Sequence, residues 1–238
     1  MCEELHGCKK LGEYGCDIFH KWRIFFMLIS AFLSFLIFLL TCVSLAGASE
    51  DDTNVENCNW AYAEYTEDSK DYTAYVGLKR FVVSNGNVDS SSSTTSNGFN
   101  WADCSDSVYD FCSDCEFAGD STLKATALAF IVSIPPVITS FIRISAANDT
   151  NANKMSTTIF CSLGILLYMI SMGQFGKLCY EKLPSDRNYI FGPGFGAAAA
   201  CFVFQIFVLI IHVSTPVRKG EVALAKEEDN QDDEDNQA

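Results

Sequence analysis

The sequence predicts a membrane all-α four-helix bundle with a small disulfide-stapled antiparallel β-sheet in its first extracellular loop. Three observations indicate this fold class. Four stretches lack Asp, Glu, Lys and Arg, and each is long enough for the ~20 apolar residues that cross a bilayer: Ile24–Gly47, Ala125–Ile142, Met155–Gly176 and Asn188–Val217. The segment between the first two stretches is rich in β-forming residues and holds four cysteines. Basic residues gather in one alternating set of connecting segments.

Each apolar stretch is expected to be helical, because backbone groups cannot remain unpaired in hydrocarbon. We expect spans at residues 24–47, 124–145, 155–177 and 192–215. Pro135 and Pro136 lie in the middle of the second span and should kink it. In the fourth span, Gly192, Gly196 and Ala200 are four residues apart. This spacing brings small residues to one helix face and favours close helix packing.

The distribution of basic residues favours a threading with both termini in the cytoplasm. Under this threading, nine bases lie in cytoplasmic segments or at the inner span ends, and four lie near the membrane on the outer side. The cytoplasmic segments are then residues 1–23, 146–154 and 216–238, and the outer loops are residues 48–123 and 178–191. We expect a multi-pass protein of the plasma membrane. The long outer loop would lie in an oxidising compartment, where disulfides persist.

An alternative for the first span is a signal peptide. Ala46-Gly47-Ala48 resembles a signal-peptidase site, and cleavage there would leave three spans. We expect this span to be retained, because its apolar run is longer than a signal core and a 23-residue segment precedes it.

The acidic residues are unevenly distributed. The net charge is −14, which argues against nucleic acid as a partner. The tail after Gly220 holds eight acids and is typical of a solvated, disordered segment. In the first outer loop, four carboxylates fall at helical spacing: Asp103, Asp106, Asp110 and Asp114. This acidic stripe could attract cations, although a solvated face is the preferred interpretation and EF-hand spacing is absent.

Eleven cysteines fall into several groups. Four lie in the first outer loop and are the disulfide candidates: Cys58, Cys104, Cys112 and Cys115. Four cysteines allow three connectivities, which the sequence leaves open. A zinc site is the rival, because Cys112 and Cys115 form a CxxC, but a second pair is missing. Cys8 and Cys16 precede the first span, where acylation is possible and free thiols are the alternative.

The first outer loop is expected to fold into a sheet. Residues 60–65 and 72–83 are rich in aromatic and β-branched residues and predict strands. Residues 84–87 predict a turn, residues 90–96 a flexible polar insertion, and Phe99 begins a further strand. Trp60 is a candidate contact with another protein or a residue packed inside the sheet.

These features together resemble the claudin and peripheral-myelin-protein superfamily of four-span proteins. Trp60 matches the early Trp of that family's first outer loop, and Gly77-Leu78 matches its Gly-Leu, with Lys79 where the family has Trp. The family's cysteine pair would correspond to Cys104 with Cys112 or Cys115. Residues 123–128 resemble the start of the family's second span. The resemblance covers roughly residues 22–216.

The resemblance implies a structural role, in which the extracellular domain organises membrane contacts or assemblies. Its partners would be the lipid bilayer and this protein itself or other membrane proteins, laterally or across membranes. The alternative is an auxiliary channel subunit or a cation-selective barrier that uses the acidic loop. We expect no enzyme, cofactor or metal site, because the three histidines lie far from the outer carboxylates and no HExxH, nucleophile-elbow or Walker motif occurs.

Overall fold

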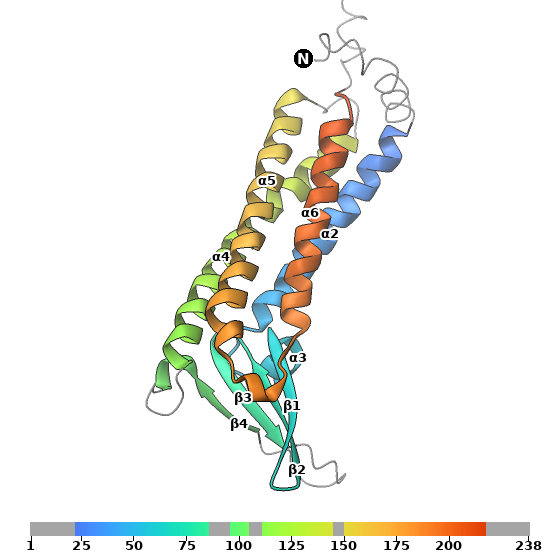
Figure 1. Ribbon diagram of the computed structural model, residues 1–238. Coiled ribbons are helices and arrows are strands. Elements are labelled where there is room, and N and C mark those ends of the chain that lie inside the picture. Colours follow the sequence, from blue (N-terminus) through green and yellow to red (C-terminus); the bar gives the residue numbers. More distant parts are fainter. Residues whose placement is uncertain (1–21, 86–95, 105–110, 145–149, 218–238) are drawn as a thin grey trace, which may run out of the picture.

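The computed structural model describes residues 22–85, 96–104, 111–144 and 150–217. Four long helices form an elongated bundle, and a sheet lies at one end of it (Figure 1). The helices are α2 (Arg23–Ala46), α4 (Cys112–Ile144), α5 (Asn151–Gln174) and α6 (Pro193–Ser214). All four are long and apolar enough to cross a membrane. We refer to the opposite end of the bundle, where α2 begins and α6 ends, as the terminal end.

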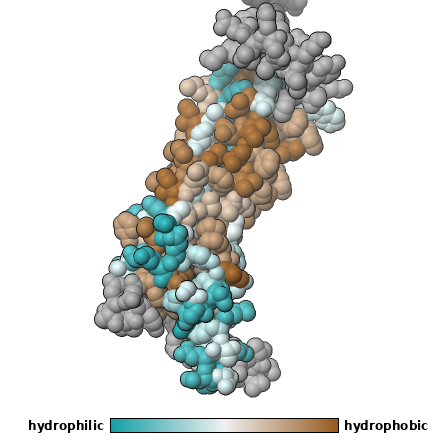
Figure 2. All heavy atoms as spheres, in the orientation of Figure 1, coloured by the Kyte–Doolittle hydropathy of each residue, from teal (hydrophilic) through white to brown (hydrophobic). Residues whose placement is uncertain are grey.

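Large apolar side chains cover the outside of the helices, whereas small and polar side chains fill the inside. Phe32, Ile131 and Phe207 are among the exposed apolar residues, and Figure 2 shows apolar surface over much of the bundle. Ser30 and Thr126 lie on the buried faces. Helix bundles in membranes have this composition, because small residues permit close contact between helices and large apolar residues face the acyl chains of the lipid. The structure is therefore compatible with a multi-pass membrane protein.

The helix bounds differ from the expected spans at two places. Helix α4 begins at Cys112, well before the expected start at residue 124, and has 33 residues. At 1.5 Å per residue it is about 50 Å long, so its first turns extend beside the sheet (Figure 1). The helix continues through Pro135 and Pro136. Helix α5 begins at Asn151 and passes into a π-helical turn, Phe175–Cys179.

The small antiparallel sheet is confirmed. Its strands are β1 (Ala61–Glu67), β2 (Lys70–Val76), β3 (Arg80–Asn85), β4 (Ser96–Asn100) and β5 (Ile190–Phe191). The order across the sheet is β4-β3-β2-β1-β5, and the pairings are antiparallel. Strand β5 comes from the loop between α5 and α6, so both loops at this end of the bundle contribute to one sheet.

Three details of the sheet region were not expected. The run at residues 72–83 forms two strands instead of one, because the chain turns between β2 and β3 at Gly77-Leu78-Lys79. The β1–β2 hairpin turns at Asp68-Ser69, where both φ angles are positive (51° and 62°), as a type I′ turn requires. A short helix, α3 (Asp52–Cys58), precedes the sheet, and the Asp51 carboxylate accepts a hydrogen bond from the backbone N–H of Thr53 at its start.

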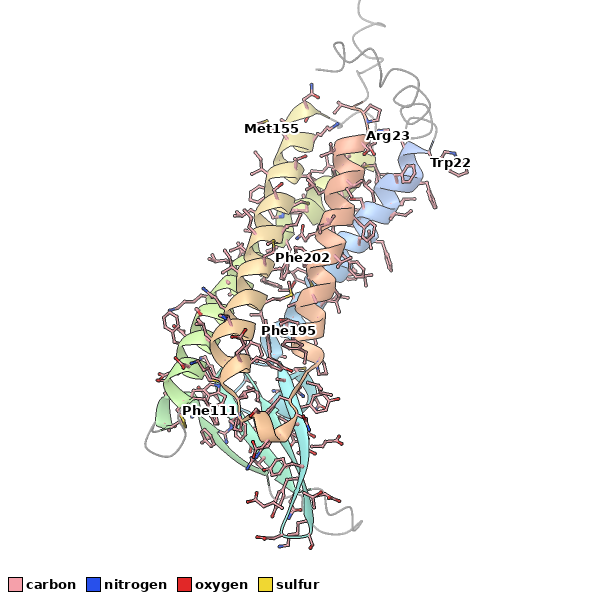
Figure 3. The ribbon with its side chains drawn as sticks, in the orientation of Figure 1. Trp22, Arg23, Phe111, Met155, Phe195 and Phe202 are labelled. Carbon is pink, nitrogen blue, oxygen red and sulfur yellow. A yellow bond between two sulfur atoms is a disulfide. The ribbon has the colours of Figure 1, made fainter. Side chains whose placement is uncertain are left out.

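One core connects the sheet to the bundle. Its buried members include Trp60 and Val76 from the sheet region, Phe175 after α5 and Ala198 from α6. Phe195 lies at the sheet end of α6, and Arg23 lies at the terminal end of the bundle (Figure 3). Since core residues from both parts are contiguous, the sheet is packed on the helices as a fixed cap.

Candidate functional site

The turn between β2 and β3 is the point where the sheet joins the helices. The Leu78 N–H donates to the Gly47 carbonyl after α2, 2.8 Å away, and the Trp101 indole N–H donates to the Gly77 carbonyl, 3.1 Å away. The Leu78 carbonyl also lies so close to Gly119 of α4 that a β-carbon there would overlap it. The predicted Gly77-Leu78 motif thus lies at a structural junction.

Trp60 lies in the same junction and is fully buried. Its indole N–H donates to the Ser44 carbonyl of α2 at 3.1 Å. Its ring packs against Phe175 and Phe195, with centroid separations of 5.1 and 5.8 Å. Of the two interpretations of Trp60, contact with another protein or internal packing, the structure shows packing. Its indole orients the base of β1 against α2, α6 and the π-helical turn that follows α5.

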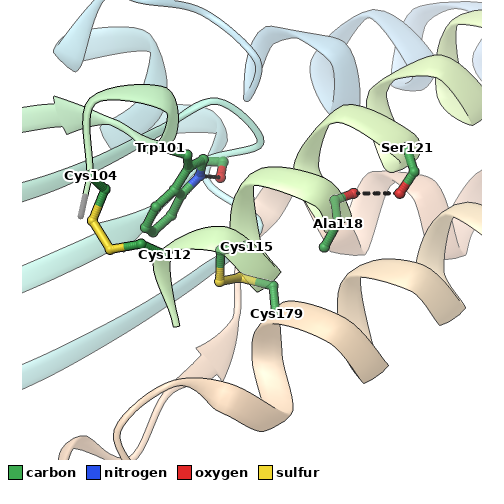
Figure 4. The surroundings of a disulfide bond; sticks show 8 residues. Trp101, Cys104, Cys112, Cys115, Ala118, Ser121 and Cys179 are labelled. Carbon is green, nitrogen blue, oxygen red and sulfur yellow. Dashed lines mark hydrogen bonds between the residues drawn. A yellow bond between two sulfur atoms is a disulfide. The ribbon is translucent and has the colours of Figure 1, made fainter. Parts of the chain in front are cut away.

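Two disulfides lie next to this junction (Figure 4). One joins Cys104, just after the sheet, to Cys112 at the start of α4. The other joins Cys115 of α4 to Cys179 at the end of the π-helical turn, across a sequence separation of 64 residues. Neither bridge connects two strands of the sheet. Because Cys112 and Cys115 are both bonded to other cysteines, the CxxC is not a thiolate pair that could hold zinc.

The inclusion of Cys58 among the bridged cysteines is wrong. Cys58 is a half-buried free thiol, and the fourth bridged cysteine is Cys179 instead. Cys58 ends α3, and its carbonyl lies against Gly47 and Gly194, at the junction of α2 and α6. Burial raises the pKa of the Cys58 thiol, so it stays protonated and weakly nucleophilic at neutral pH. No pattern in one loop's cysteines could have identified a partner in another loop.

The predicted acidic stripe is not one helical face. Asp103 lies in a short 3₁₀ turn, Trp101–Asp103, whereas Asp114 lies in α4, which begins only at Cys112. Asp106 and Asp110 lie outside the described residues. Asp103 and Asp114 therefore belong to different elements, which the Cys104–Cys112 bridge joins.

A different set of carboxylates lines a cavity of about 260 Å³ beside the junction turn. Leu78, Lys79 and residues 100–102 form one side, and Glu50 and α4 form the rest. Three carboxylates and one ammonium group belong to its lining: Glu50, Glu116, Asp120 and Lys79. Asp120 also forms an exposed ion pair with Lys124, 2.5 Å away. The lining has an excess of negative charge and suits a small cation better than an anion.

The predicted packing face of α6 is also wrong. Gly192 is the residue before α6, where its backbone fits against Asn59, but nothing lies within 4 Å of a β-carbon built at Gly196. The buried face instead follows Gly194, Ala198 and Cys201. A four-residue spacing selects one helix face but not which face the bundle covers, because Gly and Ala occur all around this turn.

The β1–β2 hairpin stands farthest from the helices (Figure 1). Its exposed residues are predominantly polar: Glu64, Thr66, Glu67, Asp68, Ser69, Lys70 and Asp71. Near its middle, the Tyr65 and Tyr72 rings stack at 5.6 Å, and the Arg187 guanidinium lies 4.0 Å above the Tyr65 ring. Arg187 comes from the loop between α5 and α6, so this loop supports the hairpin from one side.

At the terminal end, the structure has a buried polar cluster that sequence reasoning missed. Arg143 of α4 and His212 of α6 are both fully buried. The Arg143 guanidinium lies 2.7 Å from His212 Nδ1 and also donates to the Thr215 carbonyl. Ser30 of α2 and Ser140 of α4 contact His212 Nε2. The only available signal was a His and an Arg at span ends, which also fits solvent-facing side chains.

Some of the residues predicted to be functional lie outside the described part of the chain. Cys8 and Cys16, the acylation candidates, lie outside the described residues, as does the acidic tail after Gly220. Within the described part of the chain, no three His, Cys, Asp or Glu side chains gather where they could hold a metal ion.

No protein-family model matches the chain, and no curated protein matches it.

Proposed function

We propose that this chain is a claudin-like four-span membrane protein that organises membrane contacts through its sheet domain. One observation carries the proposal: the β1–β2 hairpin presents a polar surface far from the helices, while the base of the sheet is fixed to them. Trp60, the Gly77-Leu78 turn and the Cys104–Cys112 bridge provide that attachment. A recognition surface that is rigidly oriented loses less entropy on binding than a flexible loop.

Under this proposal, the apolar band of the bundle lies in the bilayer and the hairpin projects from the outer surface. The exposed side chains of the hairpin are polar, so contact with another protein would be made by hydrogen bonds and paired charges. Such surfaces suit contacts that form and separate repeatedly, and they give specificity through charge complementarity.

The proposal is tested by vesicle clustering with the full chain in lipid vesicles. Two populations carry different dyes, and co-clustering is counted. We expect wild-type vesicles to cluster with each other and not with protein-free vesicles. Exchanging two exposed hairpin charges, Glu64→Lys with Lys70→Glu, keeps the net charge and should reduce clustering at least tenfold.

The matched control exchanges an exposed ion pair beyond α5, Lys177→Glu with Glu181→Lys, whose side chains lie 3.0 Å apart. This variant also keeps the net charge and should cluster like the wild type. Equal clustering by the hairpin variant, or no clustering by the wild type, would contradict the proposal. Binding to protein-free vesicles would identify lipid as the receptor instead.

A second candidate function is a cation-selective barrier or an auxiliary channel role, and the acidic cavity beside the junction turn favours it. Glu116→Gln with Asp120→Asn removes two of its three carboxylates. If the cavity concentrates cations, this variant should lower the preference for Na⁺ over Cl⁻ across a cell layer or vesicle membrane. An unchanged preference, with the protein present at the surface, would exclude this role for the cavity.

A further inference from the structure

The contact between Arg143 and His212 determines how the imidazole is protonated. The guanidinium Nη1 lies 2.7 Å from Nδ1 of His212, and both side chains are fully buried. A guanidinium carries only donors, so Nδ1 must be the acceptor. Nδ1 is then without a proton, and the neutral imidazole carries its proton on Nε2.

The other side of the ring agrees with this tautomer. His212 Nε2 lies 2.8 Å from the Ser30 hydroxyl and 3.0 Å from the Ser140 hydroxyl. Either hydroxyl oxygen can accept the Nε2 proton. His212 therefore joins three helices at once: α4 through Arg143 and Ser140, α2 through Ser30, and α6 through its own backbone.

From this geometry, we propose that His212 is a proton-operated latch that holds α6 against α4 at the terminal end of the bundle. A second proton has one place to go, which is Nδ1. Protonation there removes the acceptor of the Arg143 bond and sets an imidazolium against a guanidinium at 2.7 Å. The contact then changes from attraction to repulsion in a site of low dielectric.

The charged groups around the latch increase this effect. The described residues that face it include Arg143 from α4, Arg23 from α2 and Lys154 from α5. Arg23 donates to the Arg143 carbonyl at 2.7 Å, and Lys154 donates to the Val213 and Thr215 carbonyls at 2.8 and 3.2 Å. All three are cationic, so a proton on His212 places a further positive charge beside them.

The last turn of α6 is the part that moves under this proposal. Arg143 and Lys154 both bind the Thr215 carbonyl, and His212 is less than one turn away. Helix movements that follow a changed contact are typically about 1–2 Å. The sheet end, which is joined by covalent bridges and backbone contacts, should not follow. This inference is independent of the proposed contact function.

The protonation state is directly measurable, because the chain has only three histidines. The full chain is labelled with ¹⁵N-histidine in lipid nanodiscs, where both membrane faces meet the same buffer. Substitutions His6→Gln and His20→Gln leave His212 as the sole signal. We expect nitrogen shifts of an imidazole with Nε2 protonated and Nδ1 bare. A proton on Nδ1 in the neutral form would overturn the proposal.

The movement is measured separately, with spin-labelled non-natural residues at two exposed positions, Phe141 on α4 and Val213 on α6. As pH falls, the distance between the labels should lengthen by about 2 Å, with the same midpoint as the nitrogen titration. A constant distance across the His212 titration would overturn the latch.

Two variants separate the latch from general acid effects. In His212→Gln, the amide carbonyl can accept from Arg143 without titrating, so the label distance should not change over the same pH range. In Arg143→Gln, His212 keeps its imidazole but has no guanidinium against Nδ1, and the distance should again stay constant. A pH-dependent distance change in His212→Gln equal to that of the wild type would contradict the proposal. If one variant fails to fold, the other still decides.

Discussion

The two ends of the bundle are held together by different chemistry. At the sheet end, aromatic rings, two disulfides and close backbone contacts join the sheet to α2, α4 and α6. At the terminal end, charged and hydroxyl side chains bind a histidine and backbone carbonyls. The first set depends on shape and covalent bonds, whereas the second depends on protonation. We expect the sheet end to be rigid and the terminal end to respond to pH.

The largest expected effect comes from the long-range disulfide at the sheet end. Cys115→Ser with Cys179→Ser should lower the free energy of unfolding by about 4 kcal/mol, because a closed loop of 64 residues is released. Cys104→Ser with Cys112→Ser releases only 8 residues and should cost about 2.5 kcal/mol. Denaturant unfolding in detergent compares the two. If removing the Cys104–Cys112 bridge lowered the free energy of unfolding more than removing the Cys115–Cys179 bridge, the longer loop would not be the main source of stability at this end.

The close backbone contact comes next. Gly119→Ala should lower the free energy of unfolding by about 3 kcal/mol, because the new β-carbon would overlap the Leu78 carbonyl. A backbone carbonyl cannot move aside as easily as a flexible side chain can. Gly173→Ala is the matched control, since nothing lies within 4 Å of its β-carbon position in α5. It should be neutral or stabilising by about 0.5 kcal/mol. Equal losses in both variants would show that helix propensity, not the contact, is responsible.

At the terminal end, Arg143→Met should lower the free energy of unfolding by about 2 kcal/mol. It leaves His212 Nδ1 and the Thr215 carbonyl with one bond fewer in a buried place. Lys124→Met removes an exposed ion pair, with both side chains more than half exposed, and should change stability by less than about 0.5 kcal/mol. Thermal unfolding of the three proteins ranks the effects.

The smallest effect at neutral pH concerns the loop that supports the hairpin. Burial raises the pKa of Tyr189 to about 12, against a partial lowering by the Arg187 charge. Between about pH 10 and 12 the unfolded state loses this proton while the folded state keeps it, so stability should fall as pH rises through that window. Below about pH 10 the group contributes no pH dependence. Tyr189→Phe should remove the decline, and an equally steep decline in that variant would assign it to other groups.

The bundle was the most predictable part of the fold. The four charge-free stretches correspond to four long helices because hydrocarbon length and backbone pairing leave few alternatives. The antiparallel sheet followed from the aromatic and β-branched runs, but its division at Gly77 did not, since Leu78 and Lys79 form a turn through contacts with Gly47 and Trp101. Local propensity does not report such distant partners.

The candidate site was less predictable than the fold. The sequence predicted a disulfide at Cys58, whereas the bridged cysteine is Cys179, because pairing depends on which loops meet in the fold. The α6 packing face was misassigned at Gly196 because small residues surround that turn. Arg143 and His212 looked like ordinary span-end residues, and only the arrangement of α4 against α6 brings them together. Each error involves residues that are distant in sequence and adjacent in space.

The bridge between Cys115 and Cys179 also sets an order of events during biosynthesis. Cys115 leaves the ribosome 64 residues before Cys179, and all of α5 is made in between. Strand β1 likewise waits for Ile190 and Phe191 before its outer edge is paired. A nascent chain therefore carries a reduced thiol at Cys115 until its third long helix is in place. The Cys115–Cys179 bridge can form only after α5 has been made, and the sheet is complete only once Ile190 and Phe191 have followed.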